Sequence, residues 1–380
     1  MAYISKRGKG WSVRIYYFDT NGKRRSKSKS DFRTKAEARA YGIDAESKLK
    51  EGISSIDSTV PFPDYFENWY KTFKKSSISA RTQHSYEYTL KILKEYFGAI
   101  TLEKMNRTLY QNFLNKFGGN HSKQTVAKIN THVRAAVKNA TYEKAIPRDF
   151  TEQTKIVYDK NLTQKIEYLS IAEMKKLVEY ISSSFNPHFT SKYMIFLAVY
   201  TGMRLGELQG LEWRDINFNF KTISIRRAWS EFENDFKDTK NESSKRIIRV
   251  NSDALIPLSE LKLAIKPKND KQQVFLSQYG TVPTSSAVNK TLRESFKKIG
   301  ITKKGFHFHS LRHTHVAYLL ASQIDLYAIS KRLGHKDIGT TSKVYSYLID
   351  EYKAKTDNQI DNALSDIKSK VRAHSAHIVK

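Results

Sequence analysis

The spacing of apolar residues changes along this chain, and this change most limits what each segment can form. Residues 11–18 and 24–32 alternate apolar and polar side chains around Asn21 and Gly22, a dipeptide that favours tight hairpin turns. Residues 34–52 follow helical spacing, with Thr34 as the N-cap and Glu37 three residues later, as a capping box requires. Residues 1–52 are therefore predicted to form a small sheet and one helix.

A bundle of helices is predicted next. A Ser-rich connector at 53–61 ends in a proline, and helical patterns follow over residues 63–73, 80–98, 108–119 and 123–146. The last pattern repeats apolar residues at steps of three and four, which gives one apolar stripe made of Val126, Ile129, Val133, Val137 and Ala140. We therefore expect a helical domain over residues 62–155.

A third region, residues 165–350, mixes helices and strands. It begins with a helix whose capping box is Ser170 and Glu173, and a long apolar helix follows over 192–204. Strand-like segments at 221–229 and 243–250 are separated by a polar turn. More helices precede a polar tail at 351–380. The predicted fold is multidomain α+β, mainly α with small β elements.

The charge of the chain indicates a polyanionic partner. Lys and Arg number 66 against 38 Asp and Glu, a formal net charge of +28, which favours nucleic acid. A membrane surface is the weaker interpretation, because no apolar run approaches the ~20 residues of a spanning helix. The N-terminus has no signal-peptide core, and the absence of cysteine excludes disulfides, thiolate zinc sites and cysteine nucleophiles. We expect a cytoplasmic protein.

Two groups of basic residues are candidates for DNA contact. Residues 1–30 hold nine Lys or Arg against one acid, so the hairpin either lies in a DNA groove or is simply a solvated, charged surface. Further basic residues lie off the apolar stripe of 123–146. The candidates are Arg14, Lys23, Arg24, Arg25, Lys27, Lys123, Lys128 and Arg134.

The stretch FHFHSLRHTH, residues 306–315, has four histidines and is open to a metal, a catalytic or a structural interpretation. His309 and Arg312 share a helix face if Ser310 caps a helix through the following residues. A zinc site is disfavoured, because carboxylate or thiolate ligands and an HExxH pattern are missing. We expect the remaining histidines to be structural, satisfied by backbone or water: His307, His313 and His315.

Three other segments place chemistry-bearing residues in a fixed order. In TGMRLGEL, Gly202 ends the apolar helix just before Arg204. In the polar turn, Lys240 is expected at the tip of a hairpin whose far strand is IIRV. In LGHKDIGTT, a helix ends at Gly334, His335 follows, and a next helix capped by the Thr pair carries Tyr345. Each segment alone has an ordinary surface or core interpretation, but the ordered set does not.

These boxes resemble the signature boxes of the tyrosine recombinases, the phage-type site-specific integrases. TGMRLGEL, HSLRHTH, LGHKDIGTT and the following tyrosine stand in that family's order across residues 165–350. Residues 59–155 are similar to the family's core-site-binding domain, and residues 1–52 resemble the arm-site-binding domain of integrases from phages and conjugative elements.

The resemblance implies an enzyme that cuts and rejoins DNA through a 3′-phosphotyrosine and integrates and excises a mobile element without ATP, metal or other cofactor. Tyr345 would be the nucleophile, Lys240 the general acid on the leaving oxygen and His309 its acid/base partner. Arg204, Arg312 and His335 would neutralise the phosphate. Glu207 is expected to hold Arg204 by an ion pair. Tyr347 is a rival nucleophile, and Ser310 stands where the family frequently has an acid.

Two other functions fit the same sequence boxes. A type IB topoisomerase uses the same chemistry, and a degenerate integrase would bind DNA without cutting it. The resemblance implies four protomers on two duplexes in a bacterial host cell, and a tail that docks onto a neighbouring protomer. An excisionase and a host DNA-bending protein are potential further partners.

Overall fold

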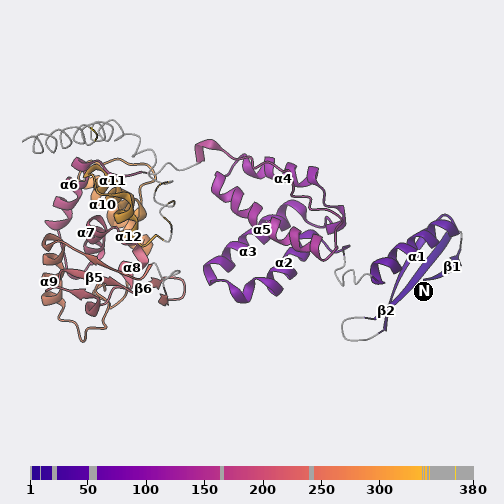
Figure 1. Ribbon diagram of the computed structural model, residues 1–380, viewed down its shortest axis with the longest axis horizontal. Coiled ribbons are helices and arrows are strands. Elements are labelled where there is room, and N and C mark those ends of the chain that lie inside the picture. The colour runs from indigo at the N-terminus through magenta and orange to yellow at the C-terminus, as the bar shows by residue number, and fades with distance from the viewer. Residues whose placement is uncertain are drawn as a thin grey trace, which may run out of the picture. The chain divides into compact units, whose positions relative to one another are not determined.

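The computed structural model describes residues 2–8, 10–18, 24–50, 58–162, 167–238 and 244–335, together with residues 337, 339, 342 and 364 (Figure 1). The chain separates into two compact units, Met1–Gln164 and Lys165–Lys380. Helices dominate and the sheets are small, which confirms the predicted fold class. Within these described ranges, every helix is too short or too polar to cross a bilayer.

The N-terminal part is a three-stranded antiparallel sheet with one helix on it. Strands β1 (Tyr3–Arg7), β2 (Gly10–Phe18) and β3 (Arg24–Phe32) lie in the order β1-β2-β3, and α1 (Lys35–Lys50) follows. Strand β1 was not predicted from the sequence. A small core forms where Val13 and Ile15 of β2 meet Ala38 of α1. The predicted turn at residues 21 and 22 lies outside the described residues.

The capping box of α1 confirms the prediction made for its N-terminus. Thr34 Oγ1 accepts from the Glu37 N–H at 3.1 Å, and Glu37 Oε2 accepts from the Thr34 N–H at 3.4 Å. Two N–H groups that lack helical partners are thereby satisfied, which fixes where the helix begins.

Four helices form the second part of the first unit. They are α2 (Phe62–Phe73), α3 (Ala80–Phe97), α4 (Arg107–Gly118) and α5 (Lys123–Tyr142), with short 3₁₀ turns η1 (Lys75–Ser77), η2 (Leu102–Lys104) and η3 (Lys160–Leu162). The predicted stripe of α5 is buried in a separate hydrophobic core, as the spacing required: Val126, Ile129, Val133, Val137 and Ala140. Its aromatic content is high, with Phe62, Phe97 and Phe150 packed edge to face.

The second unit surrounds the buried helix α7. Its helices are α6 (Ile171–Ser182), α7 (Ser191–Thr201), α8 (Leu205–Gln209), α9 (Ser252–Ile265), α10 (Ser285–Lys298), α11 (Phe308–Ala321) and α12 (Leu326–Leu333), with η4 (Trp213–Asp215). The capping box of Ser170 and Glu173 begins α6, as predicted. Helix α7 is apolar around its whole circumference and lies in the largest core, where α10 and α11 pack against it.

The strands of this unit correct one prediction. Strands β4 (Ile216–Asn217), β5 (Thr222–Ile225) and β8 (Arg246–Arg249) form one sheet, whereas β6 (Arg227–Ser230) pairs with β7 (Asp235–Asp238). The predicted segments 221–229 and 243–250 do pair, as β5 with β8, but they do not form a simple hairpin, because β6 and β7 pair with each other between them. Burial explains this pairing: Ile223 and Ile225 of β5 share the core with Ile248 of β8.

One histidine is buried in the helical bundle. His132 of α5 stacks on Tyr86 with ring centroids 3.9 Å apart, and its Nδ1 lies 2.8 Å from the Thr89 hydroxyl. Burial, followed by the charge of Lys128, lowers the pKa of His132 to about 4. The ring is therefore uncharged in the folded protein at neutral pH.

We expect the protein to lose stability as the pH falls from about 6.5 toward about 4, in part through His132. The unfolded chain binds a proton near the ordinary histidine pKa of about 6.5, whereas the folded state resists it until about 4, so acid favours unfolding. His132→Phe keeps a ring on Tyr86 and cannot titrate. Denaturant unfolding of this variant should depend less steeply on pH in that window.

The matched control is His84→Phe in α3, whose side chain is 76% exposed. This substitution should change the pH slope of the unfolding free energy less than His132→Phe does, because the side chain is not buried. Equal slopes for His132→Phe and the unmodified protein would contradict the assignment.

Candidate active site

The site begins at the glycine that ends α7. Gly202 adopts the left-handed conformation with φ +65°. A Cβ on this residue would lie 2.7 Å from His315 Cδ2 and 2.9 Å from Leu333 Cδ2, so no side chain fits. The turn ends the apolar helix, as predicted, and brings Arg204 to the N-cap position of α8.

A buried carboxylate holds Arg204. Arg204 Nη1 donates to Glu207 Oε1 at 2.8 Å, which confirms the predicted ion pair. Glu207 also binds Arg246 of β8 through both carboxylate oxygens, at 3.1 and 2.9 Å. Burial by itself raises the pKa of Glu207, but the hydrogen bonds and charges of Arg246 and Arg204 outweigh it and lower that pKa. Of the two arginines, Arg204 is the accessible one, with 37% of its side chain exposed against 7% for Arg246.

Arg312 of α11 binds the C-terminal ends of two other helices, α7 and α12. Its Nη1 donates to the carbonyl of Gly202 and its Nη2 to that of Leu333, each at 2.7 Å. Both carbonyls belong to helix C-termini, where main-chain acceptors lack helical partners and positive charge is favourable. The same Nη2 lies 3.0 Å from His335 Nε2.

The geometry fixes the proton on His335. An arginine N–H can only donate, so Nε2 of His335 accepts and the neutral ring carries its hydrogen on Nδ1. Burial and then the charge of Arg312 lower the pKa of His335 to about 4, which keeps the ring neutral at pH 7. Gly334, at φ +68°, ends α12 just before it, as the sequence indicated.

His309 lies one turn before Arg312 on α11, as expected from their spacing. Its ring meets His313 edge to face at 5.0 Å. Part of His309 is open to solvent, yet exclusion of water by its surroundings, followed by the charge of Arg312, lowers its pKa to about 4. The prediction that Ser310 caps this helix is wrong: His307 is the N-cap, and Ser310 Oγ accepts from its N–H at 3.3 Å.

Two further histidines are satisfied by the protein, as expected. His315 Nδ1 donates to the Val199 carbonyl at 2.8 Å, and its Nε2 accepts from Arg332 Nε at 3.3 Å. His307 Nδ1 lies 3.0 Å from the Gly305 carbonyl. In the part of the chain that the structure describes, no three His, Asp or Glu side chains come close enough to share a metal ion.

The structure thus brings together four of the six predicted catalytic residues: Arg204, His309, Arg312 and His335. Lys240, Tyr345 and its rival Tyr347 lie outside the described residues. Arg246 was missed in the sequence, although a signal existed: it precedes Ile248 by two residues on a strand, so it shares the face of a core residue.

The basic candidates outside this cluster lie on exposed surfaces. Arg14 of β2 donates to the Ser28 hydroxyl, and Arg24 lies over the Tyr16 ring at 4.6 Å, on the sheet face opposite α1. The basic residues of α5 are exposed as predicted: Lys123, Lys128 and Arg134. Lys23 lies outside the described residues, and the side chains of Arg25 and Lys27 are not described.

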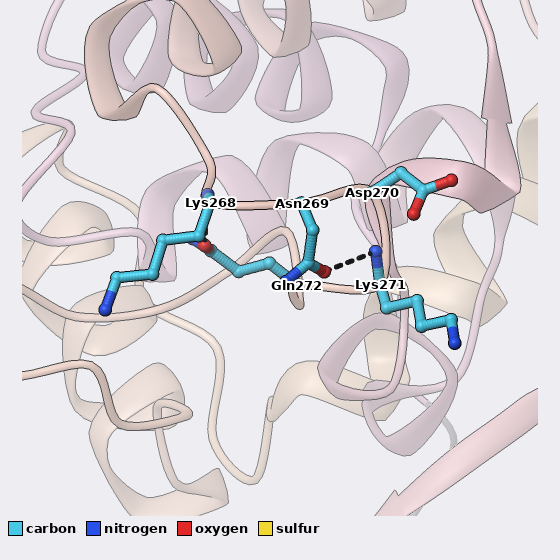
Figure 2. A pocket seen from close by; sticks show the side chains of 5 residues that line it. All are labelled: Lys268, Asn269, Asp270, Lys271 and Gln272. Carbon is cyan, nitrogen blue, oxygen red and sulfur yellow. Dashed lines mark hydrogen bonds between the residues drawn. The ribbon is translucent and has the colours of Figure 1, made fainter.

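A surface hollow elsewhere in the second unit is lined by a single polar loop. Figure 2 shows the loop of Lys268, Asn269, Asp270, Lys271 and Gln272 that lines it. The Asn269 side chain accepts from the Lys271 N–H within this loop. The hollow shares no residue with the arginine and histidine cluster, and the two lysines extend away from the loop.

Three family models match this chain. Residues 167–351 match the phage integrase family, residues 2–49 match an arm DNA-binding domain, and residues 61–118 match the N-terminal SAM-like domain of phage integrases.

Similar proteins cover most of the chain. It is 26% identical to the integrase of Staphylococcus phage L54a over 83% of this chain and 98% of that protein. It is 24% identical to the ICEBs1 integrase of Bacillus subtilis over 87% and 91%. Among solved structures, the Tn1549 transposon integrase in complex with a circular intermediate DNA has TM-score 0.67 at 18% identity, covering 79% of this chain and 99% of that chain. A lambda integrase dimer bound to a COC′ core site has TM-score 0.60 at 20% identity, covering 90% and 93%.

We expect Gly202→Ala to destabilise the second unit by more than the backbone strain alone, which usually costs about 1–3 kcal/mol. The new Cβ would also press on His315 and Leu333. The control is Gly300→Ala, at φ +71° with no atom within 4 Å of a new Cβ, which should show the backbone cost alone. Thermal unfolding measures both, and equal losses would refute a steric role for Gly202.

Proposed function

The chain belongs to the tyrosine recombinases of the phage integrase family, site-specific enzymes that cut and rejoin DNA strands, and we propose that Arg204, Arg312 and His335 bind the phosphate that Tyr345 attacks. The observation that carries this proposal is the convergence on Arg312. Arg312 binds the carbonyl of Gly202, which stands two residues before Arg204. It also binds the C-terminus of α12 and the His335 ring, so these groups lie together around one side chain.

The proposed reaction exchanges one phosphodiester for another. The Tyr345 oxygen attacks phosphorus in line, the bond to the 5′ oxygen breaks, and a 3′-phosphotyrosine forms. Lys240 gives a proton to the leaving 5′ oxygen. His309, neutral at pH 7 because its pKa is about 4, accepts the tyrosine proton. A 5′ hydroxyl from the exchanged strand reverses these steps, so the bond energy is retained and neither ATP nor a metal is needed.

The charges suit this chemistry. A phosphodiester repels nucleophiles, and its transition state gathers further negative charge on the non-bridging oxygens. Arginine stays positive at any physiological pH and offers forked donors, so Arg204 and Arg312 supply fixed charge. His335 adds the N–H of Nδ1, because its Nε2 already accepts from Arg312.

The same proposal divides the DNA contacts among the parts of the chain. Residues 1–52 bind a distant arm site, 53–61 link them to residues 62–155 on the core site, and 165–350 perform the cleavage. The exposed basic side chains of β2, β3 and α5 support the first two assignments. Much of the affinity should come from phosphate contacts and fall steeply with salt.

Four strand cuts require four active sites, so we propose a homotetramer on two duplexes. A lambda integrase tetramer has been solved bound to a Holliday junction, and its fold is similar to that of this chain, with TM-score 0.58 at 20% identity over 88% of this chain and 95% of that one. Residues 351–380 would dock onto the neighbouring protomer. The enzyme would act on DNA in the cytoplasm of a bacterial host, with an excisionase and a host DNA-bending protein as further partners.

A suicide substrate tests the nucleophile. A nicked core-site DNA should trap a covalent adduct with the unmodified protein and none with Tyr345→Phe, because phenylalanine has no oxygen to attack with. Tyr347→Phe is the matched control and should retain the adduct on a denaturing gel. The reverse pattern would move the nucleophile to Tyr347.

The same assay separates the alternative functions. A non-catalytic accessory protein would form no adduct at all. A topoisomerase of type IB would relax a supercoiled plasmid that lacks any core site.

The division of DNA contacts makes a second prediction. Replacing Lys23, Arg24 and Arg25 by alanine should weaken arm-site binding, since each residue lost removes a counterion-releasing contact, and should spare cleavage of an isolated core site. Gel shifts at several salt concentrations measure the first effect and adduct formation the second.

A control for net charge replaces three lysines of the second unit by alanine: Lys266, Lys268 and Lys271. This variant should bind the arm site as the unmodified protein does. A parallel loss of arm binding and core cleavage in the hairpin variant would contradict the division.

A further inference from the structure

Arg246 of β8 makes a set of hydrogen bonds that spans three elements. Its Nε donates to the Arg332 carbonyl at 2.7 Å, and its Nη1 donates to Glu207 at 3.1 Å and to the Ser244 carbonyl at 3.0 Å. Its Nη2 donates to the second carboxylate oxygen of Glu207 at 2.9 Å. These four bonds engage four of the five N–H groups of the guanidinium.

The bonds reach the two ends of the candidate active site. Glu207 lies on α8, one turn after Arg204, and forms an ion pair with that arginine through the same carboxylate that binds Arg246. The Arg332 carbonyl lies near the C-terminus of α12, three residues before His335. The Arg246 guanidinium thus links α8, whose N-cap is Arg204, to the C-terminal end of α12, which precedes His335.

We propose that Arg246 is a positioning residue for strand cleavage, which sets Arg204 and His335 at the spacing that one phosphate requires. This inference rests on the proposed function, since it concerns the same phosphate. It assigns no direct DNA contact to Arg246, because four of its five N–H groups bind protein acceptors.

The charge balance gives the proposal a specific consequence. Two arginines share one carboxylate, so Arg204 is only partly neutralised by Glu207. Without Arg246, the whole negative charge of Glu207 would face Arg204 alone and draw its guanidinium away from an incoming phosphate. The end of α12 would lose one of the two arginines that hold its carbonyls, the other being Arg312.

The test measures adduct formation in a single turnover on the nicked core site, with DNA affinity measured separately. Arg246→Met should slow cleavage about 100-fold, as expected for a misplaced catalytic group, with little change in Kd. Arg246→Lys keeps the charge but cannot bridge both partners, so it should also cleave slowly. The matched control is Arg249→Met, an exposed arginine of the same strand, which should cleave at the normal rate.

A double variant controls for misfolding, because Arg246→Met leaves Glu207 buried with half of its hydrogen-bond partners. Glu207→Gln combined with Arg246→Met removes both charges. If Arg246 acts through Glu207, this double variant should be no slower than Arg246→Met alone. A further tenfold or greater loss in the double variant, about 1.4 kcal/mol, would mean independent roles and would overturn the proposal.

A second substrate separates positioning from general loosening. A methylphosphonate at the scissile position carries no charge, so the placement of Arg204 matters less for it. The defect of Arg246→Met should therefore shrink on this substrate, whereas a loosened fold would slow both substrates equally and would overturn the proposal. Normal cleavage by Arg246→Met would overturn this inference alone. Absence of an adduct from the unmodified protein would overturn the proposed function together with it.

Discussion

A buried arginine at the meeting point of two helix ends organises the second unit. Arg312 is 3% exposed, and a charge so far from water is tolerated only when its donors are well matched. The carbonyls of Gly202 and Leu333 provide that match, since both are helix C-terminal acceptors with a favourable dipole. The positions of Arg204 and His335 follow from this anchoring, because each stands two residues beyond one of those carbonyls.

Much of this arrangement could be predicted from local sequence signals. Capping boxes at Thr34 and Ser170, the apolar stripe of α5, and the glycines that end α7 and α12 act over a few residues, and the structure confirms them. The pair of Arg204 and Glu207 is equally local, being one helical turn apart. Such features are set by helix geometry, which a sequence displays directly.

The features that the sequence did not disclose depend on distant partners. The pairing of β6 with β7, inserted between the predicted partners β5 and β8, was not indicated by the sequence. Arg246 and Arg332 look like ordinary surface cations until Glu207 and the ends of other elements come near them. Position 310 shows a smaller limit, since histidine at 307 takes the capping position expected of the serine.

In the part of the chain that the structure describes, the hydrophobic cores of each region come from one continuous stretch. The N-terminal core uses residues 2–45, the bundle core residues 60–158, and the cores of the second unit residues 168–333. Recombination between related genes at the connectors that join these regions would therefore transfer complete hydrophobic cores and would leave no core with part of its residues missing. Mosaic descendants could inherit the reaction chemistry from one ancestor and the preference for a distant DNA address from another.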